Sequence, residues 1–404
     1  MRVHAPAGPD ANGRLAVTLE EGTKKDSFYF ASRDFNLQPS GEALIASALF
    51  AAMQSGAALG LAGTISREFY ETIGDIQDIL AEWHPQLAKV GIEGCQPQPC
   101  SVAPAGRVGL FFSAGVDSFY SLLKHQDEIT DLIFIRGHEF RARENELLDR
   151  NARIVHETAR RMGKHVIEVE TDLRWLLASK GLKWVKVTHG AVMAAIGLLL
   201  QGEFRRIYIA ATGNYARLDP WPSHPMLDPM WGTEALEFVH DGCELNRVEK
   251  VAVLAREDWV LRSLRVCGEY TTTAPNCGRC EKCIRTMLNL LAAGALERGP
   301  QFEVGLDAQR IRRMRVSDFH RLEDEKDNLH ALAQAGAPRA IIRALRSAIH
   351  RWERRFLLMR LARTLPSPLR LLLRLPYRLL RRLGLIERRP REAGEQAAEM
   401  QGAS

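Results

Sequence analysis

The sequence predicts an α/β fold, namely a doubly wound parallel sheet with a small α+β domain before it and a helical, Arg-rich extension after it. Between residues 107 and about 292, short apolar strands alternate with helical patterns, and this alternation is typical of a parallel sheet covered by helices. After about residue 306 the pattern is helical and increasingly basic. We therefore expect three parts, residues 1–104, 105–295 and 296–404.

The N-terminal part is expected to contain a β-hairpin and two helices. The stretches "RLAVTLEEG" and "DSFYFAS" alternate apolar and polar residues on either side of Gly22-Thr23, which predicts the hairpin. Helical patterns follow at 41–55 and 65–83. Residues 95–106, "CQPQPCSVAPAG", are rich in proline and polar residues and predict a linker to the central part.

The central part is expected to supply four strands, and helical patterns lie between them at 117–126, 144–162 and 188–202. The strands are "RVGLFFS", "DLIFIRG", "KHVIEVET" and "RRIYIAATG". In an open parallel sheet, ligands bind at the carboxyl ends of the strands, near the point where the strand order reverses. The loops that follow these strands are therefore the first place to look for a functional site.

Composition and charge indicate where in the cell the protein is expected. The chain has 404 residues and a formal net charge of +6, and between Arg339 and Arg389 only Glu353 and Glu387 oppose the arginines. No secretion signal and no apolar run long enough to span a bilayer is evident. Seven cysteines in a chain of this length do not make a disulfide scaffold. We expect a cytoplasmic protein, and the basic tail leaves peripheral contact with a membrane surface open.

The loop after the first central strand carries the strongest chemical pattern. In "VGLFFSAGVDSFYSLLKH" an apolar strand runs into Ser113-Ala114-Gly115-Val116-Asp117-Ser118, and a helix starts at once. Small residues let backbone N–H groups approach an anion, and the helix adds its positive N-terminal end. Asp117 can hold a metal ion or cap the helix. From these residues alone, a phosphate-binding loop and an ordinary strand-to-helix loop are equally supported, because the GxxxxGK[ST] pattern is absent.

A cysteine cluster lies far downstream, in "RVCGEYTTTAPNCGRCEKCIRTM". Cys277, Cys280 and Cys283 form C-x₂-C-x₂-C, and Cys267 supplies a fourth thiolate. Four sulfurs suit tetrahedral Zn²⁺, and Gly278 permits the tight turn around a metal ion. An iron–sulfur cluster and unrelated thiols are the alternatives, but four cysteines with such spacing are most commonly a structural zinc site.

The loop also resembles a known motif. "FFSAGVDSFYSLL" is similar to the SGGxDS signature of the PP-loop ATP pyrophosphatases, which cleave ATP between its α and β phosphates; Ser113, Gly115, Asp117 and Ser118 match and Ala114 departs. The resemblance implies a PP-loop fold in which residues 113–118 bind ATP and the leaving pyrophosphate, and Asp117 is catalytic and helps to bind Mg²⁺. Since alanine disfavours positive φ, we expect Ala114 to adopt a conformation open to any L-residue.

The two motifs together resemble 7-cyano-7-deazaguanine synthase, over about residues 107–292. The loop is followed by C-x₉-C-x₂-C-x₂-C and Ile-Arg, and "FIRGHE" and Gly213-Asn214 match further elements of that family. Its members adenylate a deazaguanine carboxylate, let ammonia attack to give an amide, and dehydrate the amide to a nitrile. The resemblance implies ATP, Mg²⁺ and Zn²⁺ as cofactors and Cys267, Cys277, Cys280 and Cys283 as zinc ligands.

Two departures from that family leave the substrate open. "KVTHG" (186–190) replaces a Pro-x-Arg-Asn stretch, and residues 215–250 replace a short loop that reads the base. The longer segment is either a surface loop held by its tryptophans or a substrate-binding lid, and we favour the lid, because loops over strand ends carry specificity. The candidate substrate contacts are His189, Gly213, Asn214, Trp221, His224 and Arg247.

The tail "RTLPSPLRLLLRLPYRLLRRLGL" places Arg370, Arg374 and Arg378 four residues apart, with leucines opposite. Such a stretch can bind an anionic membrane, nucleic acid or a partner protein, or it can pack on the protein's own core. The sequence leaves these alternatives open.

Three functions are consistent with these features. The first is an ATP-dependent C–N ligase that adenylates an acid and passes it to ammonia or to an amine, including an amine on a protein or peptide. The second is a PP-loop tRNA-modifying enzyme whose basic tail grips RNA. The third is a nucleotide-binding regulatory module without catalysis. Thiolating tRNA enzymes of this superfamily usually need a catalytic cysteine pair, whereas the clustered cysteines here suit a metal, which favours the first function.

Overall fold

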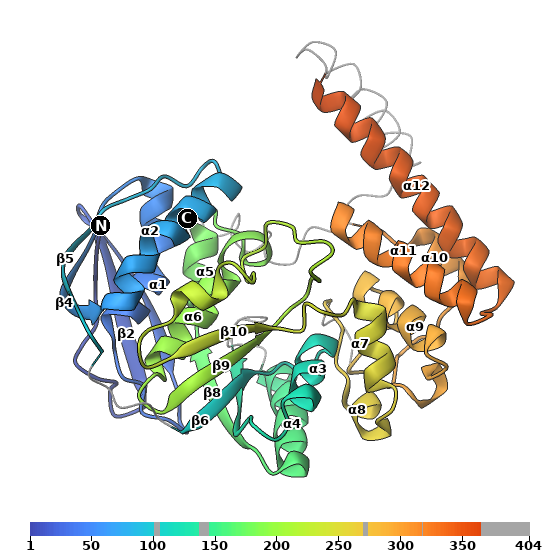
Figure 1. The fold of residues 1–404 in the computed structure, drawn as a ribbon, viewed down its shortest axis with the longest axis horizontal. Coiled ribbons are helices and arrows are strands. Elements are labelled where there is room, and N and C mark those ends of the chain that lie inside the picture. The colour runs from blue at the N-terminus through green and yellow to red at the C-terminus, as the bar shows by residue number, and fades with distance from the viewer. Residues whose placement is uncertain (101–105, 137–144, 270–273, 317, 365–404) are drawn as a thin grey trace, which may run out of the picture.

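The structure is a computed structural model that describes residues 1–100, 106–136, 145–269, 274–316 and 318–364. The fold is α/β, with one mixed sheet of ten strands and helices on both of its faces (Figure 1). The expected α/β class is confirmed. The strands of the central part are parallel, as expected, but the N-terminal strands extend the same sheet with antiparallel neighbours rather than forming a separate domain.

The central part supplies five strands, all parallel to their neighbours: β6 (Arg107–Phe111), β7 (Asp131–Arg136), β8 (His165–Thr171), β9 (Phe204–Ala210) and β10 (Glu237–Asp241). Their order in space is β8-β7-β6-β9-β10. Counted along the chain, this order is 3-2-1-4-5, so the winding reverses between β6 and β9. The loops after β6 and β9 therefore meet at the switch point.

Strands β6 and β7 are buried on both faces. On β7, Leu132 and Phe134 lie in one hydrophobic core, and Ile133 and Ile135 lie in the other. Successive side chains of a strand point to opposite faces, so a strand covered on both sides needs an unbroken apolar run. This requirement explains why these strands were evident in the sequence.

Helices α3 (Val116–Lys124), α4 (Asn145–Met162) and α6 (His189–Leu199) confirm the helical patterns expected between the central strands. A short helix α5 (Leu173–Ser179) and a π-helical turn η1 (Trp184–Thr188) precede α6. Helix α6 is apolar on almost every side because it is enclosed by the sheet and by helix α1 of the N-terminal part.

The N-terminal part adds β1 (Arg2–His4), β2 (Arg14–Glu21), β3 (Lys24–Ala31), β4 (Leu59–Ser66) and β5 (Ile92–Gln98). Strands β2 and β3 form the expected hairpin. Strand β3 pairs with β8 through Phe30–Thr171 and Ala31–Glu170, so residues 1–104 share a sheet with the central part. Helices α1 (Gly41–Ser55) and α2 (Arg67–Trp83) confirm the two expected helices.

The expectation of a linker is wrong for residues 95–98, which belong to strand β5. Strand β5 pairs in parallel with β4 through Cys95–Gly63 and Pro97–Ile65. A proline is tolerated there because β5 lies at the edge of the sheet, where the missing N–H is not needed for a second neighbour. Residues 101–105 of the expected linker lie outside the described part.

The C-terminal part is helical, as expected, and gathers beside the sheet (Figure 1). Helices α10 (Ala308–Arg313), α11 (Phe319–Gln334) and α12 (Arg339–Thr364) lie in this part. They follow α7 (Arg247–Leu254), α8 (Asp258–Ser263) and α9 (Glu281–Ala292), which end the central part. A third core of Met287, Leu345 and Trp352 joins α9 to α12. In the described part, no single helix has the length and apolar character to span a membrane, and only the bent pair Leu173–Ser179 and Trp184–Leu199 meets that test.

Candidate nucleotide-binding loop and metal centre

The Ser113–Ser118 loop leaves β6 at the switch point and opens α3. The Ser118 hydroxyl donates to the Gly115 carbonyl (3.2 Å) and lies 3.4 Å from the Ser113 N–H, which fixes the turn from inside. Gly115 is the N-cap of α3, and no side chain caps this helix. The first N–H groups of α3 are thus left uncapped by the protein's side chains at the place where an anion is expected to bind.

Ala114 adopts a left-handed conformation with φ of 58°, and among the described residues no other non-glycine has a positive φ. The expectation that Ala114 adopts a conformation open to any L-residue is therefore wrong. Its side chain is buried, and its carbonyl accepts a hydrogen bond from the Arg265 N–H (2.9 Å). A left-handed L-residue costs about 1 kcal/mol or more, so the surrounding contacts must impose this conformation.

Asp117 does not cap α3, because its side chain faces two cations of α7. Its Oδ2 accepts from Nη1 of Arg247 (3.2 Å), and its Oδ1 lies 3.5 Å from Nζ of Lys250 and makes no hydrogen bond. Lys250 also donates to the carbonyl of Ala211, just after β9 (2.6 Å). Burial lowers the pKa of the Arg247 guanidinium, and the charge of Asp117 opposes that effect.

A buried ionic network continues from this site into the C-terminal helices. Arg285 of α9 donates to Asp324 of α11 (2.5 Å) and lies 3.4 Å from Glu281. The charge of Arg285 adds to the lowering of the Arg247 pKa. Glu325 is fully buried, and this burial raises its pKa to about 8 although Arg285 opposes the shift. Charged side chains thus lie in a buried region between the loop and α11, where their effects on one another are strong.

Strand β10 holds α3 in place through Asp241. This carboxylate accepts from Ser121 (2.6 Å), from Lys124 (2.8 Å) and from Nε2 of His125 (2.9 Å). Burial alone would raise the pKa of Asp241, but the hydrogen bonds from Lys124, Ser121 and His125 outweigh it and lower the pKa. Asp241 was not among the predicted site residues, because its role depends on a strand that the sequence did not reveal.

The structure brings several predicted substrate contacts together at this end of the sheet. The rings of His189 and Trp221 lie 5.9 Å apart, and Nζ of Lys186 lies 4.7 Å from the Trp221 ring centroid. Arg247 meets Asp117, as described above. Gly213 and Asn214 follow β9, and the Asn214 side-chain oxygen is buried without a hydrogen bond.

His224 is a core residue rather than a substrate contact. It is buried, its Nδ1 accepts from the Met226 N–H (3.1 Å), and its ring lies 5.0 Å from that of Trp83. Burial lowers the pKa of His224, which keeps the ring neutral. Its inclusion among the candidate substrate contacts was wrong, because neither ring face is presented to solvent.

The lid interpretation of residues 215–250 is likewise corrected. The segment contains a 3₁₀ turn η2 (Asp228–Trp231) and strand β10, which pairs with β9 over five residues. Trp231 is almost fully buried, 6.3 Å from the ring of Phe69 in α2. Most of these residues complete the sheet and its core, and Tyr215 (61%) and Met226 (53%) are the segment's most exposed large hydrophobic side chains.

Cys267, Cys277, Cys280 and Cys283 form a buried cluster whose four sulfurs lie within 4.8 Å of one another. Such a donor set can bind a metal ion such as zinc. The N–H groups of Arg279 and Cys280 both point at Sγ of Cys277 (3.3 Å each), the pattern of a metal-binding knuckle. Hydrogen bonds among the thiols lower the pKa of Cys267 and raise the pKa values of Cys280 and Cys283, so without a metal ion the cluster favours one thiolate that the other thiols hydrogen-bond. A bound metal ion would displace the remaining protons.

Two further residues shape this cluster. The Asn276 side chain accepts from the N–H groups of Val266 (2.8 Å) and Cys267 (3.2 Å) and donates to the Leu264 carbonyl (3.0 Å), so it ties the two cysteine-bearing segments together. Gly278 has φ of 68°, and a Cβ there would lie 2.0 Å from the carbonyl oxygen of Val304. No other residue type fits at position 278 without displacing the backbone.

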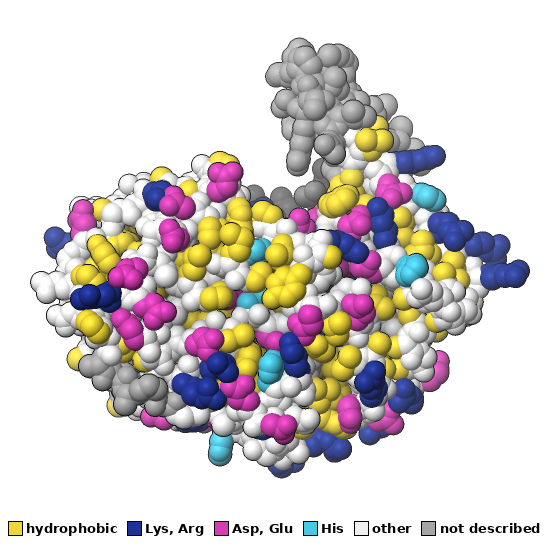
Figure 2. Space-filling view, in the orientation of Figure 1, with side chains coloured by type: hydrophobic (Ala, Val, Ile, Leu, Met, Phe, Trp, Pro, Cys, Tyr) yellow, Lys and Arg dark blue, Asp and Glu magenta, His cyan; other side chains and the backbone are white. Residues whose placement is uncertain are grey.

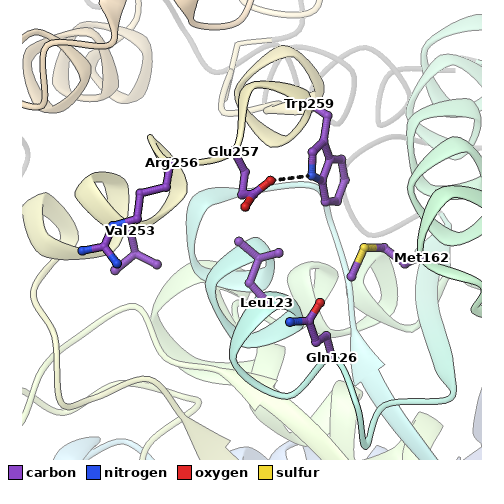
Figure 3. A pocket seen from close by; sticks show the side chains of 7 residues that line it. All are labelled: Leu123, Gln126, Met162, Val253, Arg256, Glu257 and Trp259. Carbon is purple, nitrogen blue, oxygen red and sulfur yellow. Dashed lines mark hydrogen bonds between the residues drawn. The ribbon is translucent and has the colours of Figure 1, made fainter.

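A separate cavity of about 220 Å³ lies at the opposite, C-terminal end of α3 (Figure 3). Its lining side chains are Leu123, Gln126, Met162, Val253, Arg256, Glu257 and Trp259. Because the candidate loop opens the N-terminal end of α3, this cavity is separate from that loop.

Some predicted features lie outside the described residues. These are the end of the "FIRGHE" stretch after Arg136 and the tail arginines Arg370, Arg374 and Arg378. Comparison of the chain with protein-family models, curated proteins and solved structures finds no match.

Proposed function

We propose that this protein is an ATP-dependent adenylating enzyme of the PP-loop pyrophosphatase type. It splits ATP into AMP and pyrophosphate and activates a carboxylate for attack by ammonia or an amine. The observation that carries the proposal is the Ser113–Ser118 loop, which combines an uncapped helix start, a left-handed Ala114 and the Asp117–Arg247–Lys250 cluster at the switch point of the sheet.

The loop is suited to phosphate binding. A left-handed residue between a strand and a helix turns successive N–H groups toward one point, which is the geometry of an anion-binding nest. Arg247 and Lys250 add two positive charges that are already held in place by Asp117. Positioning and charge neutralisation are the main contributions a protein makes to phosphoryl chemistry.

The proposed reaction has two steps. An oxygen of the substrate carboxylate attacks the α-phosphorus of ATP, the bond to the β-phosphate oxygen breaks, and pyrophosphate leaves. An uncharged amine nitrogen then attacks the activated carbonyl carbon, the carbon–oxygen bond to AMP breaks, and the nitrogen loses a proton to solvent. Adenylation is needed because a free carboxylate has no good leaving group.

Mg²⁺ and zinc have separate roles in this proposal. Asp117 would help to hold the Mg²⁺ that accompanies the phosphates, and the metal ion would supply positive charge there. A zinc ion at the four cysteines would be structural, because all four are buried and leave no protein-free coordination position. Arg265, whose N–H holds Ala114, lies two residues before Cys267, so the metal centre braces the loop.

The substrate class follows from the resemblance to 7-cyano-7-deazaguanine synthase, so the acid is proposed to be a 7-deazaguanine acid or a related planar acid. The aromatic rings of Trp221 and His189 and the unpaired side-chain oxygen of Asn214, which follows β9, would suit such an acid. The product, an amide or a nitrile, depends on whether a second ATP-driven step removes water.

Pyrophosphate release from ATP tests the proposal. The protein is incubated with ATP and Mg²⁺ alone, with a deazaguanine acid and ammonia, or with bulk tRNA. We expect release to require the acid and AMP to form in equal amount. Release that requires tRNA would instead identify a tRNA-modifying enzyme, and ATP binding without release in every arm would identify a nucleotide-binding module.

A further inference from the structure

Helix α12 extends beyond the surface against which it packs. Its buried side includes Leu345, Ile349 and Trp352, and the Trp352 indole donates to the Met314 carbonyl (3.1 Å). Among the side chains described after Trp352, those of Glu353 and Phe356 are partly buried, and the helix continues to Thr364 and points away from the body (Figure 1). Arg354, Arg355, Leu357 and Leu358 are exposed.

The outer side of α12 is basic. Between Arg339 and Leu358 the sequence has six arginines and a single acidic residue, Glu353. Glu353 accepts from Lys326 (3.1 Å) and from His350 (3.2 Å), so it does not neutralise the exposed arginines. Arg343, Arg346 and Arg354 are exposed and lie on one face by their spacing.

This basic side also carries exposed leucines. Leu357 is 58% exposed and Leu358 is 62% exposed, directly after Arg354 and Arg355. Figure 2 shows hydrophobic side chains beside Lys and Arg side chains along this outer helix. Residues 369–385 continue the same composition, with leucines and arginines and no acidic residue.

This chemistry selects one class of partner. A nucleic-acid backbone would pair with the arginines but would gain nothing from two adjacent leucines. An anionic bilayer offers phosphate headgroups for the arginines and an acyl boundary a few ångströms deeper for the leucines. We propose that the outer face of α12, from Arg343 to Leu358, binds the surface of an anionic phospholipid membrane.

Vesicle co-sedimentation of the full chain tests this proposal. We expect binding to vesicles that contain phosphatidylglycerol and little binding to phosphatidylcholine alone, with affinity falling as salt increases. The double substitution Arg354→Gln/Arg355→Gln should weaken vesicle binding about 25-fold, because each arginine near an anionic surface contributes about fivefold to the affinity. Leu357→Ser/Leu358→Ser should weaken it at least about tenfold, because the leucine contribution is burial in lipid.

Matched controls distinguish a specific contact of α12 from non-specific adsorption to vesicles. Tyr70→Ser removes a large side chain, 41% exposed, from α2 at the other end of the molecule, and it should leave vesicle binding unchanged (Figure 1). All four α12 substitutions are at exposed positions, so thermal melting should be unaffected. A chain ending at Thr364 should keep part of the binding, with the same dependence on Leu357 and Leu358.

Four results would overturn the proposal. The first is no sedimentation of the full chain with anionic vesicles. The second is wild-type binding by the leucine variant together with lost binding by the arginine variant, which would indicate charge alone. The third is tighter binding to RNA or duplex DNA with the same arginine dependence. The fourth is complete loss on truncation after Thr364 while both α12 variants bind normally, which would place the contact in the tail.

Discussion

The N–H of Arg265 donates a hydrogen bond to the carbonyl of Ala114 (2.9 Å), so the segment leading into the cysteine cluster is joined to the candidate phosphate loop. Arg265 lies two residues before Cys267, and Asn276 holds the same segment through the N–H groups of Val266 and Cys267. The left-handed conformation of Ala114 is therefore supported from the side of the cysteine cluster. The cysteine cluster and the Ser113–Ser118 loop are thus in contact at the turn that contains Ala114, although they lie far apart in the sequence.

The first prediction concerns Ala114. Ala114→Gly should stabilise the fold by about 1 kcal/mol, because glycine adopts φ of 58° without a Cβ penalty, and ATP binding should be kept or strengthened. Ala114→Val should destabilise the protein and weaken ATP binding strongly, because a β-branched residue is poorly tolerated at positive φ. Chemical denaturation and calorimetric titration with ATP and Mg²⁺ measure both effects.

The comparison of these two variants tests the loop directly. If Ala114→Val binds ATP as tightly as the unmodified protein does, the phosphates do not bind at this turn. If Ala114→Gly is less stable, the left-handed conformation does not exist in solution.

The second prediction concerns the metal centre. Purified protein should contain about one zinc ion per chain, and Cys280→Ser should reduce the metal content and lower the melting temperature. Since Arg265 connects this centre to Ala114, the same variant should also weaken ATP binding. Elemental analysis, thermal melting and ATP titration are the measurements. Cys100→Ser, outside the cluster, is the matched control and should change none of them.

A well-folded protein without any zinc would contradict this prediction. Normal ATP binding by a metal-free, folded Cys280→Ser variant would show that the centre does not brace the loop.

Sequence patterns predicted the parts of the fold that are buried on both faces. The strand around Leu132 and Phe134 was evident because such strands must be apolar throughout. Strand β10 was missed because it is an edge strand of five residues with Glu237 exposed and His240 paired to a buried acid, which breaks the apolar run. The pairing of β3 with β8 links segments about 140 residues apart, and no local pattern specifies such a partner.

The candidate site was predictable to the same degree. Asp117 and the four cysteines lie in short motifs, and the spacing of the residues within each motif is enough to indicate its chemical role. Asp241 gave no such pattern, since it acts through Ser121 and Lys124 of another element. The positive φ of Ala114 was not predictable, because it is imposed by Arg265, which is far along the chain.

The third prediction concerns Asp117 and its partner Arg247. Asp117→Asn keeps the shape but removes the charge that holds Arg247, so AMP and pyrophosphate formation should fall by at least about a hundredfold. The free energy of unfolding should fall by about 1–3 kcal/mol, because a buried guanidinium loses its ionic partner. Asp219→Asn, an exposed carboxylate, should leave both quantities near those of the unmodified protein.

A double-mutant cycle with Arg247→Gln makes this prediction specific. The two substitutions should be non-additive in stability by about 1 kcal/mol or more, since they remove the same contact. Wild-type turnover by Asp117→Asn, or strict additivity, would show that the pair does not matter to the site.

The last prediction concerns Glu325, whose burial raises its pKa to about 8. Between about pH 4.5 and 8 the folded protein holds a proton that the unfolded chain releases, so this group makes the free energy of unfolding fall as pH rises through that window. Glu325→Gln mimics the protonated acid and keeps an oxygen for the Asn328 amide, so it should stabilise the protein by up to about 3 kcal/mol at pH 7 and flatten the pH dependence. Denaturant unfolding across this pH range measures how the free energy of unfolding depends on pH.

Glu323→Gln is the control, because Glu323 is a partly exposed residue of α11 that is paired with Lys326. This substitution should leave the slope of the free energy of unfolding against pH unchanged. An equal slope in both variants would mean that Glu325 is ionised in the fold and is neutralised by Arg285.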